Sequence, residues 1–425
     1  MNPVDTVWVL ISGALVLLMT PGLAIFYGGM VRAKSVLNMI MMSFSTMGLI
    51  TILWIVYGYS LAFGPDTGSG FIGDLAHLGL NGAVTELVGG EGHLIPAAAF
   101  VFFQMTFAII TTALLSGVVA DRIKFSSWLV FAAAWFTVVY LPLAHMAFAA
   151  QGGTGGWLID RLGALDFAGG TAVEINSGAS ALALAFVIGK RLGFKRDPMR
   201  PHNLPFVLLG AGLLWFGWFG FNAGSALAVT GTAAVAMINT QIATAAAALS
   251  WIVVESRRDG KPTTLGIASG AIAGAVAITP ACGFVSPLGA LVIGAIGGAA
   301  SSYAVGMKYK FGYDDSLDVV GVHGVGGVVG MISIGFLATA SVNPGIADGL
   351  LTGGGTVLLV KQLIAVVVTM VYAFAATWIV AKLVDKTIGL RVDPEVETAG
   401  VDTNLHAESA YDFTGVSGAG HLGRS

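Results

Sequence analysis

The chain has 425 residues, 56% of them hydrophobic and only 10% charged, and a formal net charge of −3. Soluble domains carry about 25% charged residues, so this composition predicts an integral membrane protein, and the small net charge does not favour nucleic acid as a partner. The single cysteine, Cys282, excludes an intramolecular disulfide and any multi-cysteine metal site.

Long stretches without Asp, Glu, Lys or Arg mark the expected membrane spans. They are 6–31, 35–65, 92–120, 125–159, 201–254, 262–307, 319–347 and 362–381. A span needs about 20 residues, so the fifth and sixth stretches hold two spans each, and 175–189 completes another. We therefore expect an all-α membrane protein with eleven transmembrane helices, near 7–31, 36–63, 98–120, 127–149, 168–189, 205–225, 229–254, 263–280, 286–306, 318–340 and 356–385.

Basic residues fix the expected orientation. Seventeen Lys and Arg residues follow odd-numbered spans, whereas only Arg161 and Lys361 lie in the loops of the opposite side. Because cytoplasmic loops carry the excess of basic residues, this asymmetry predicts an outside N-terminus and a cytoplasmic C-terminus, in the cytoplasmic (inner) membrane.

The odd number of spans predicts an inverted repeat. Five spans in the first half turn the second half over, so we expect repeats at about 7–189 and 205–340, with an extra helix at about 356–385. Transporters of this design bind substrate near the midplane, at the interface of the repeats. Residues 1–390 then form the membrane domain, and 391–425 form a cytoplasmic tail with a possible regulatory role.

The fifth and tenth expected spans each contain an ionisable residue in an apolar, glycine-rich stretch. Glu174 lies in DFAGGTAVE (166–174) and His323 in DVVGVHGVGG (318–327), each with a Val before it and a Gly four residues after it. Ionisable groups inside membranes usually line transport pathways, so we interpret them as a central polar pair that shares or passes a proton. The alternative is a structural hydrogen bond that pins the two spans together.

Four aspartates precede these two spans. Asp166 stands at the outer start of the fifth span, where it either caps the helix or also attracts cations to an outer vestibule. Asp314, Asp315 and Asp318 precede the tenth span. Of these three we expect Asp318 to cap the helix and the other two to be solvated.

Aromatic residues gather near the outer ends of spans 3, 4 and 6: Phe102, Phe103, Phe107, Phe148, Trp215, Trp218, Phe219 and Phe221. They are explained either by an interfacial aromatic belt or by a cation–π cage for a small cation, with Ser225 as a nearby hydrogen-bond acceptor. We expect His145 and His202, close to span ends, to be caps or surface residues.

The sequence contains no phosphate-binding loop, metal-spaced cluster or nucleophile elbow. We therefore expect no enzyme activity, no metal and no cofactor.

Six blocks resemble the Amt/Mep/Rh ammonium transporters, bacterial Amt branch. They are PGLAIFYGG (21–29), DFAGG (166–170), GWFGFNAGS (217–225), TPACG (279–283), DVVGVHGVGG (318–327) and GLRV (389–392), within a resemblance that runs from about Val7 to Tyr411. The resemblance implies homotrimers with one pore per subunit. It also implies ammonium, ammonia and methylammonium as substrates, and agrees with the eleven-helix, N-out topology.

The resemblance assigns roles to particular residues. It implies an outer recruitment site of Phe103, Phe107, Phe148 and Ser225, with Asp166 nearby and with Phe148 where many bacterial members have Trp. It implies a constriction of Phe107 and Phe221, next to the pore-lining Trp218. His323 matches the second of the family's twin pore histidines, whereas Glu174 stands where the first would be, as in some fungal members.

Energetics then favour a particular mechanism. A bare cation in a medium of low dielectric costs tens of kcal/mol, which ammonium avoids by losing its proton at the constriction. Ammonia then crosses the pore while Glu174 and His323 relay the proton, so net transport is electrogenic.

The tail resembles the family's regulatory segment at VDTN (401–404) and ESAY (408–411), which implies a PII-class signal protein as a possible partner. The alternatives are an ammonium sensor, against which the lack of an appended kinase or cyclase domain argues, and an electroneutral Rh-type gas channel.

Overall fold

The protein is a helix bundle in a computed structural model that describes residues 1–411. Its helices are α1 (Pro3–Met30), α2 (Val36–Leu53), α3 (Tyr59–Phe63), α4 (Ala97–Leu114), α5 (Phe125–Trp135), α6 (Leu141–Phe148), α7 (Asn176–Ile188), α8 (Leu204–Gly224), α9 (Gly231–Asp259), α10 (Thr264–Ile278), α11 (Pro287–Phe311), α12 (Val325–Leu337), α13 (Val357–Thr387), α14 (Pro394–Ala399) and α15 (Val401–His406). Two short antiparallel strands, β1 (Leu87–Val88) and β2 (Ile95–Pro96), pair with Leu87 opposite Pro96.

The described residues contain ten helical segments that are long and apolar enough to cross a membrane. Each lies within a few residues of a predicted span. The remaining predicted span, 263–280, corresponds to α10, which is apolar but has only 15 residues. The all-helical membrane fold is therefore confirmed, whereas the number of eleven spans stays a prediction.

The described residues contain five wider, π-helical turns, and nothing in the sequence pattern predicted them. Two of these turns open the segments that carry the ionisable pair: Gly170–Ile175 precedes α7, and Val320–Gly324 precedes α12. The other three are Trp54–Gly58, Phe136–Tyr140 and Trp157–Leu162. Such turns inside helices often occur at functional sites.

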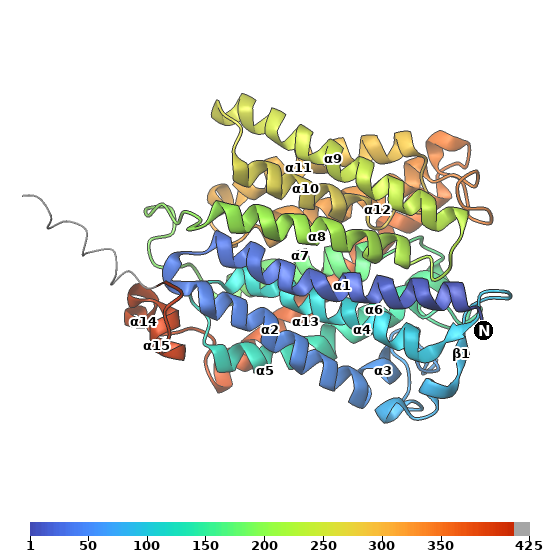
Figure 1. The fold of residues 1–425 in the computed structure, drawn as a ribbon, viewed down its shortest axis with the longest axis horizontal. Helices are drawn as coiled ribbons and strands as arrows, with labels where there is room; N and C mark the ends of the chain where they lie inside the picture. Colours follow the sequence, from blue (N-terminus) through green and yellow to red (C-terminus); the bar gives the residue numbers. More distant parts are fainter. Residues whose placement is uncertain (412–425) are drawn as a thin grey trace, which may run out of the picture.

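The long helices run roughly side by side, so the bundle has two distinct ends (Figure 1). The N-terminus and β1 lie at one end, which we call the β1 end, and α14 and α15 lie at the other, which we call the α14 end. Helices α1 and α8 pass through the middle of this view, whereas α9, α10 and α11 form one edge of the bundle.

Reciprocal glycine contacts bring the two π-helical segments together. A Cβ atom on Gly178 of α7 would lie 2.2 Å from the Cα atom of Gly324, and one on Gly327 of α12 would lie 2.8 Å from the Cβ atom of Glu174. Both distances are too short for a side chain. The glycine four residues after each ionisable residue thus lets the opposite backbone approach, as small residues do between membrane helices.

The first part of the tail packs on the α14 end of the bundle. The carboxylate of Asp402 in α15 accepts hydrogen bonds from the backbone N–H groups of Leu37 (3.0 Å) and Asn38 (2.8 Å). These are donors of the first turn of α2. The N-cap residue of this helix, Ser35, makes no side-chain cap of its own. The tail therefore supplies the cap that α2 lacks. Residues 412–425 of the predicted tail lie outside the described part of the chain.

The Gly178 contact yields a stability test. We expect Gly178→Ala to lower the thermal stability of the solubilised protein, because overpacking costs about 1–3 kcal/mol. Gly212→Ala in α8 is the matched control, since nothing lies within 4 Å of its added Cβ atom. Alanine favours a helix over glycine by about 1 kcal/mol, so the control keeps or gains stability. Equal melting temperatures for the two variants would contradict the close crossing.

Candidate functional site

Glu174 and His323 lie side by side in the interior of the bundle. Glu174 Oε2 is 2.7 Å from His323 Nδ1, and both residues are buried. One proton occupies this contact: either the imidazole N–H donates to the carboxylate or the carboxyl O–H donates to the imidazole nitrogen. Among residues 1–411, the other ring nitrogen, Nε2, has no hydrogen-bonding partner. The structure therefore brings together the two ionisable residues that the sequence paired.

A small apolar cavity borders this pair. It has a volume of about 20 Å³ and is lined by Glu174, His323 and mainly apolar side chains: Met19, Leu23, Phe26, Tyr27, Ile110, Leu114, Val173, Leu214, Trp218, Phe221 and Ile272. A cavity needs about 10–15 Å³ to hold one water molecule. This inner cavity therefore accommodates one molecule of the size of water or ammonia and offers an ion almost no polar ligands.

Two phenylalanine rings separate the inner cavity from a larger one at the β1 end. The ring centroids of Phe107 and Phe221 are 4.3 Å apart, and Phe221 lines the inner cavity whereas Phe107 lines the larger one. Trp218 lines the inner cavity, and its indole N–H donates to Thr279 Oγ1 at 2.9 Å, which fixes the ring. The predicted constriction residues are thus neighbours in the structure.

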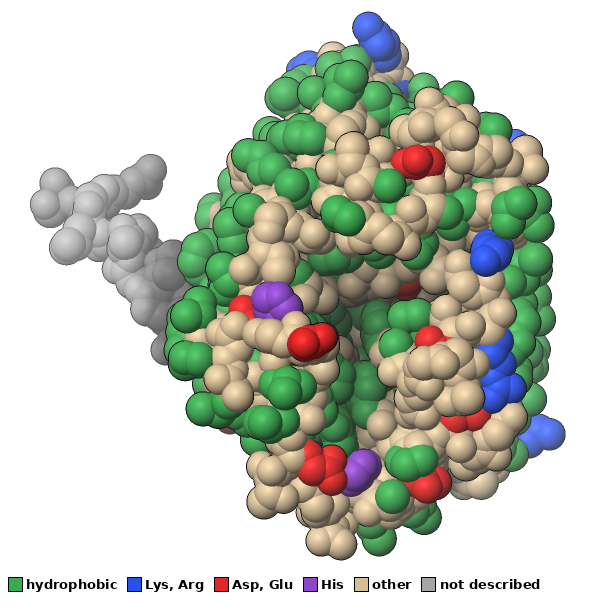
Figure 2. Space-filling view, turned by 90° about the vertical axis from the view of Figure 1, so that its right-hand side faces the viewer, with side chains coloured by type: hydrophobic (Ala, Val, Ile, Leu, Met, Phe, Trp, Pro, Cys, Tyr) green, Lys and Arg blue, Asp and Glu red, His purple; other side chains and the backbone are tan. Residues whose placement is uncertain are grey.

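This larger cavity, which we call the outer cavity, has a volume of about 500 Å³ and opens at the β1 end. Figure 2 shows a hollow with largely hydrophobic walls at this end of the molecule, with acidic and histidine side chains around it. Its lining includes four of the predicted recruitment residues, namely Phe107, Phe148, Asp166 and Ser225. The other aromatic lining residues are Tyr59, Phe63, Phe100 and Phe167, and the other polar side chains belong to His93, Gln104 and Gln151.

Phe103 does not line this cavity. It is fully buried and packs edge-on against Phe107, with 4.8 Å between the ring centroids. Phe103 thus packs against the Phe107 ring without reaching the cavity itself. Ser225 donates its hydroxyl hydrogen to the Phe221 carbonyl at 2.7 Å, so only its oxygen lone pairs remain to accept a bond from a ligand.

Asp166 caps the π-helical turn that carries Glu174. Its carboxylate accepts backbone N–H groups of Gly169 (2.9 Å), Gly170 (2.7 Å) and Thr171 (2.7 Å), and also the Thr171 hydroxyl at 2.5 Å. Asp166 also lines the outer cavity. The capping function is therefore real, and the carboxylate stands where its negative charge faces the cavity.

His145 is not the cap or surface residue that we expected. It is fully buried, with Nδ1 2.9 Å from the Ala62 carbonyl and Nε2 3.1 Å from Asp66 Oδ1. Both ring nitrogens thus lie within hydrogen-bonding distance of oxygen atoms. Arg161 also pairs with Asp66, at 2.7 Å.

Burial raises the pKa of Asp66, but hydrogen bonds from Gly70, Gly68 and His145 outweigh it and hold that pKa below its ordinary value. This cluster fixes the end of α6 that carries Phe148.

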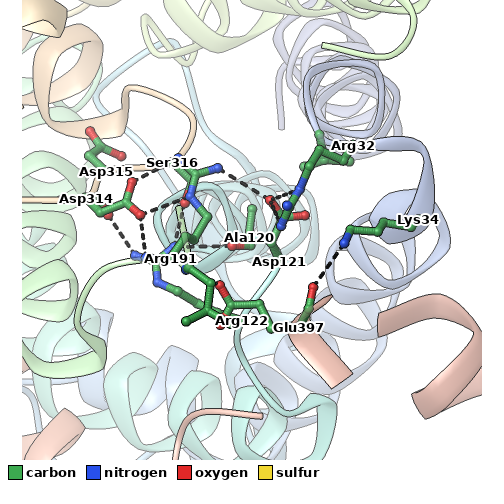
Figure 3. A network of polar contacts seen from close by, with 12 residues as sticks. Arg32, Lys34, Ala120, Asp121, Arg122, Arg191, Asp314, Asp315, Ser316 and Glu397 are labelled. Carbon is green, nitrogen blue, oxygen red and sulfur yellow. Dashed lines mark hydrogen bonds and ion pairs between the residues drawn. The ribbon is translucent and has the colours of Figure 1, made fainter. Parts of the chain in front are cut away.

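The α14 end holds a buried network of charges (Figure 3). Asp314 pairs with Arg191 at 2.9 Å, and Arg122 donates to the Asp314 carbonyl (2.7 Å) and to Ser316 Oγ (2.6 Å). Arg32 and Arg191 both contact Asp121. Burial raises the pKa of Asp314, but Arg191 and Arg122 outweigh it and hold that pKa below its ordinary value.

The structure corrects our expectation for the aspartates before the tenth span. Asp314 and Asp315 are buried, not solvated, because one pairs with Arg191 and the other accepts the Val320 N–H at 2.7 Å. Asp315 therefore caps the π-helical turn, in place of Asp318, which pairs with Lys308 at 2.6 Å. Sequence alone did not reveal partners that come from distant loops.

A helical membrane protein with an aromatic outer cavity, a ring constriction and a narrow inner cavity is built for transport. The sequence profile of the Ammonium Transporter Family matches residues 7–411. The chain therefore belongs to the ammonium transporter family, whose members are transporters and not enzymes.

Relatives and solved structures agree with this assignment. An ammonium transporter of Mycobacterium tuberculosis is 53% identical over 98% of this chain and 91% of that protein, and one of Bacillus subtilis is 48% identical over 96% and 98%. The crystal structure of Saccharomyces cerevisiae Mep2 superimposes with a TM-score of 0.84 at 33% identity, covering 93% of this chain and 91% of that one. A structure titled Sensor Amt Protein gives 0.86 at 28%, covering 94% and 98%.

The buried network at the α14 end yields a second stability test. We expect Asp314→Asn to destabilise the protein by about 3 kcal/mol, because it removes the closer of the two carboxylates that pair with the buried Arg191 and leaves only Asp121 at 3.4 Å. The contribution of Asp314 is present at neutral pH and is lost as the pH falls below the ordinary carboxyl value of 3.8, since its folded pKa is lowered. Thermal unfolding in detergent measures the change.

Asp197→Asn is the control for this test. Asp197 is exposed and has no ion pair among residues 1–411, so its substitution should change stability by no more than about 0.5 kcal/mol. Equal stability of Asp314→Asn and the wild type would refute the role of the buried pair.

Proposed function

We propose that the protein is an electrogenic ammonium transporter. Ammonium binds in the outer cavity and loses its proton at the Phe107–Phe221 constriction. Ammonia then passes through the inner cavity while the proton moves separately through Glu174 and His323. The observation that carries this proposal is the 2.7 Å contact between two buried ionisable groups beside an apolar cavity of molecular size.

The lining of the outer cavity supports recruitment of a small cation. The faces of Phe107 and Phe148 attract a cation, each by about 0.5–1 kcal/mol where water has access. Asp166 adds a negative charge and Ser225 an oxygen acceptor. Phe103 contributes by holding the Phe107 ring. Methylammonium carries the same charged head and is expected as a second substrate.

The inner cavity supports deprotonation before passage. Transfer of a bare cation into a medium of low dielectric costs tens of kcal/mol, and the apolar lining offers no set of ligands to offset this. Neutral ammonia avoids the cost. Potassium has no proton to lose and is excluded on the same ground.

The hydrogen bond between Glu174 and His323 supports a separate proton path. A carboxylate beside the imidazole offsets part of the cost of placing a positive charge in this apolar cavity. The acid also accepts and donates a proton itself. We infer that Glu174 takes the role that the resemblance assigns to the first pore histidine.

We further propose eleven spans arranged as an inverted repeat of five and five plus α13, in the inner membrane, with the β1 end outside. The bias of basic residues supports this orientation. The reciprocal contacts of Gly178 and Gly327, one in each half, support the repeat. Residues 1–390 then form the membrane domain, and 391–425 the cytoplasmic tail.

Assembly and partners follow from family membership. We propose a homotrimer with one pore per subunit. A PII-class signal protein is the proposed partner of the cytoplasmic face, where α14 and α15 pack on the membrane domain.

An ammonium sensor is the second candidate function, which the similarity to the Sensor Amt Protein favours. An electroneutral ammonia channel of Rh type is the third. Ammonium-driven current in proteoliposomes separates the three, since a sensor conducts little and a neutral channel gives no current.

Glu174 variants test the proposed mechanism. We expect Glu174→Gln to reduce the ammonium-driven current about 100-fold, because general acid–base transfer contributes about 10²–10⁴. We expect Glu174→His to keep current with a changed pH profile, since imidazole and carboxyl titrate in different ranges. Currents in solid-supported membranes and uptake of labelled methylammonium measure both effects.

The melting temperatures of the purified Glu174 variants serve as the control for folding. A Glu174→Gln protein that keeps the wild-type current and pH profile would show that the acid is no relay.

Phe148 tests the recruitment site. We expect Phe148→Trp to raise the apparent affinity for methylammonium about two- to fivefold, because the indole face binds cations better than the phenyl face. The maximal rate should change less than the affinity, since Phe148 lies in the outer cavity and not at the constriction. An unchanged affinity would remove Phe148 from the recruitment site.

A further inference from the structure

A proton that reaches the Glu174–His323 pair must leave it toward the α14 end, and the proposed function names no acceptor there. A candidate acceptor lies in the segment 314–318, just before the π-helical turn of His323. Asp315 in this segment is 98% buried, and its Oδ1 atom has no hydrogen-bonding partner among residues 1–411. Buried polar atoms without a partner are rare and call for an explanation.

Asp315 contacts the start of the helical turn that carries His323. Its other oxygen, Oδ2, accepts the backbone N–H of Val320, the first residue of the turn that contains His323. Tyr27, whose ring lines the inner cavity with Glu174 and His323, is also close enough to Asp315 and Asp318 for their charges to act on its hydroxyl group.

The segment that contains Asp315 also borders open space. Lys308 of α11 contacts both the Asp315 carbonyl (3.0 Å) and the carboxylate of Asp318 (2.6 Å). Asp318 lines a third cavity, of about 570 Å³, at the α14 end of the bundle. The segment 314–318 therefore reaches open space at Asp318, on the side opposite to the outer cavity. In Figure 3 it lies at the edge of the charge network, beside Asp314.

We propose that Asp315 is the exit acceptor of the proton path, a positioning and relay group that receives the proton from the Glu174–His323 pair. This inference rests on the proposed function. The ammonium N–H bond breaks at the constriction, the proton moves to the pair and then forms an O–H bond at Asp315 Oδ1. The proton finally leaves to solvent past Asp318, where ammonia takes it up again, so one ammonium disappears on one side and one forms on the other.

The charges around Asp315 suit this task. Burial and the negative charge of Asp318 raise its pKa to about 6, against the opposing charge of Lys308. The other titratable groups near it include Asp314, the preceding residue, and the hydroxyl groups of Tyr27 and Tyr313, on which the charge of Asp315 acts. A carboxyl of this pKa is mostly ionised at neutral pH, and it accepts and releases a proton without a large free-energy change.

The test separates charge movement from ammonia movement. Wild-type protein, Asp315→Asn and Asp315→Glu are reconstituted in liposomes, with Asp197→Asn as the control for a carboxylate that lines the same third cavity but is exposed. Current after an ammonium step is recorded on solid-supported membranes. Alkalinisation by neutral ammonia is measured with an enclosed pH dye, relative to protein-free liposomes.

We expect Asp315→Asn to reduce the current at least tenfold while ammonia-driven alkalinisation stays within about twofold of wild type. We expect Asp315→Glu to restore current with a shifted pH profile, and Asp197→Asn to behave as wild type. A current and pH profile that Asp315→Asn leaves unchanged would overturn the inference, as would an equal loss of both fluxes, which assigns a structural role only.

A spectroscopic measurement covers the case in which Asp315→Asn fails to fold. Infrared difference spectra of the wild type between pH 5 and pH 7 should contain the C=O band of a buried carboxyl group that shifts in Asp315→Glu. Absence of such a band overturns the inference. If the wild type itself gives no current, the proposed function fails and the inference with it, whereas a wild-type current with an unaltered Asp315→Asn removes the inference alone.

Discussion

Two ionisable side chains share a hydrogen bond inside an apolar helix bundle, and the arrangement of the whole bundle depends on keeping them there. An isolated charge at this depth costs several kcal/mol, so Glu174 and His323 are tolerable only as a pair. The pair forms because Gly178 and Gly327 let two helical segments cross almost backbone to backbone. A side chain at either glycine would separate the segments and leave each ionisable group to find another partner.

The ends of the two crossing segments are held by charges of similar design. Asp166 takes up the free N–H groups of the turn that carries Glu174, and Asp315 takes up the first N–H of the turn that carries His323. One carboxylate borders the outer cavity, and near the other one Lys308 and Asp318 line the cavity at the opposite end. Each of the two π-helical turns thus begins at an acid that stabilises it.

Much of this was accessible from the sequence. Charge-free stretches located the helices to within a few residues because the lipid requires each span to be long and apolar, and the matching stretches around Glu174 and His323 predicted their pairing. Partners across the fold were not accessible. The burial of Asp314 and His145 depends on Arg191 and Asp66, distant in sequence, and the place of Phe103 behind Phe107 depends on side-chain rotamers. The π-helical turns have no marker in the sequence beyond their glycines.

The contact between the Phe107 and Phe221 rings has a consequence for the cell as well as for selectivity. Because the ring centroids are only 4.3 Å apart, Phe107 and Phe221 separate the outer cavity from the inner one. A membrane stores free energy as a voltage, and one elementary charge falling through 100 mV releases about 2.3 kcal/mol. Under the electrogenic mechanism proposed above, the paired rings would insulate the two cavities from each other, so the voltage would be spent only when a substrate passes.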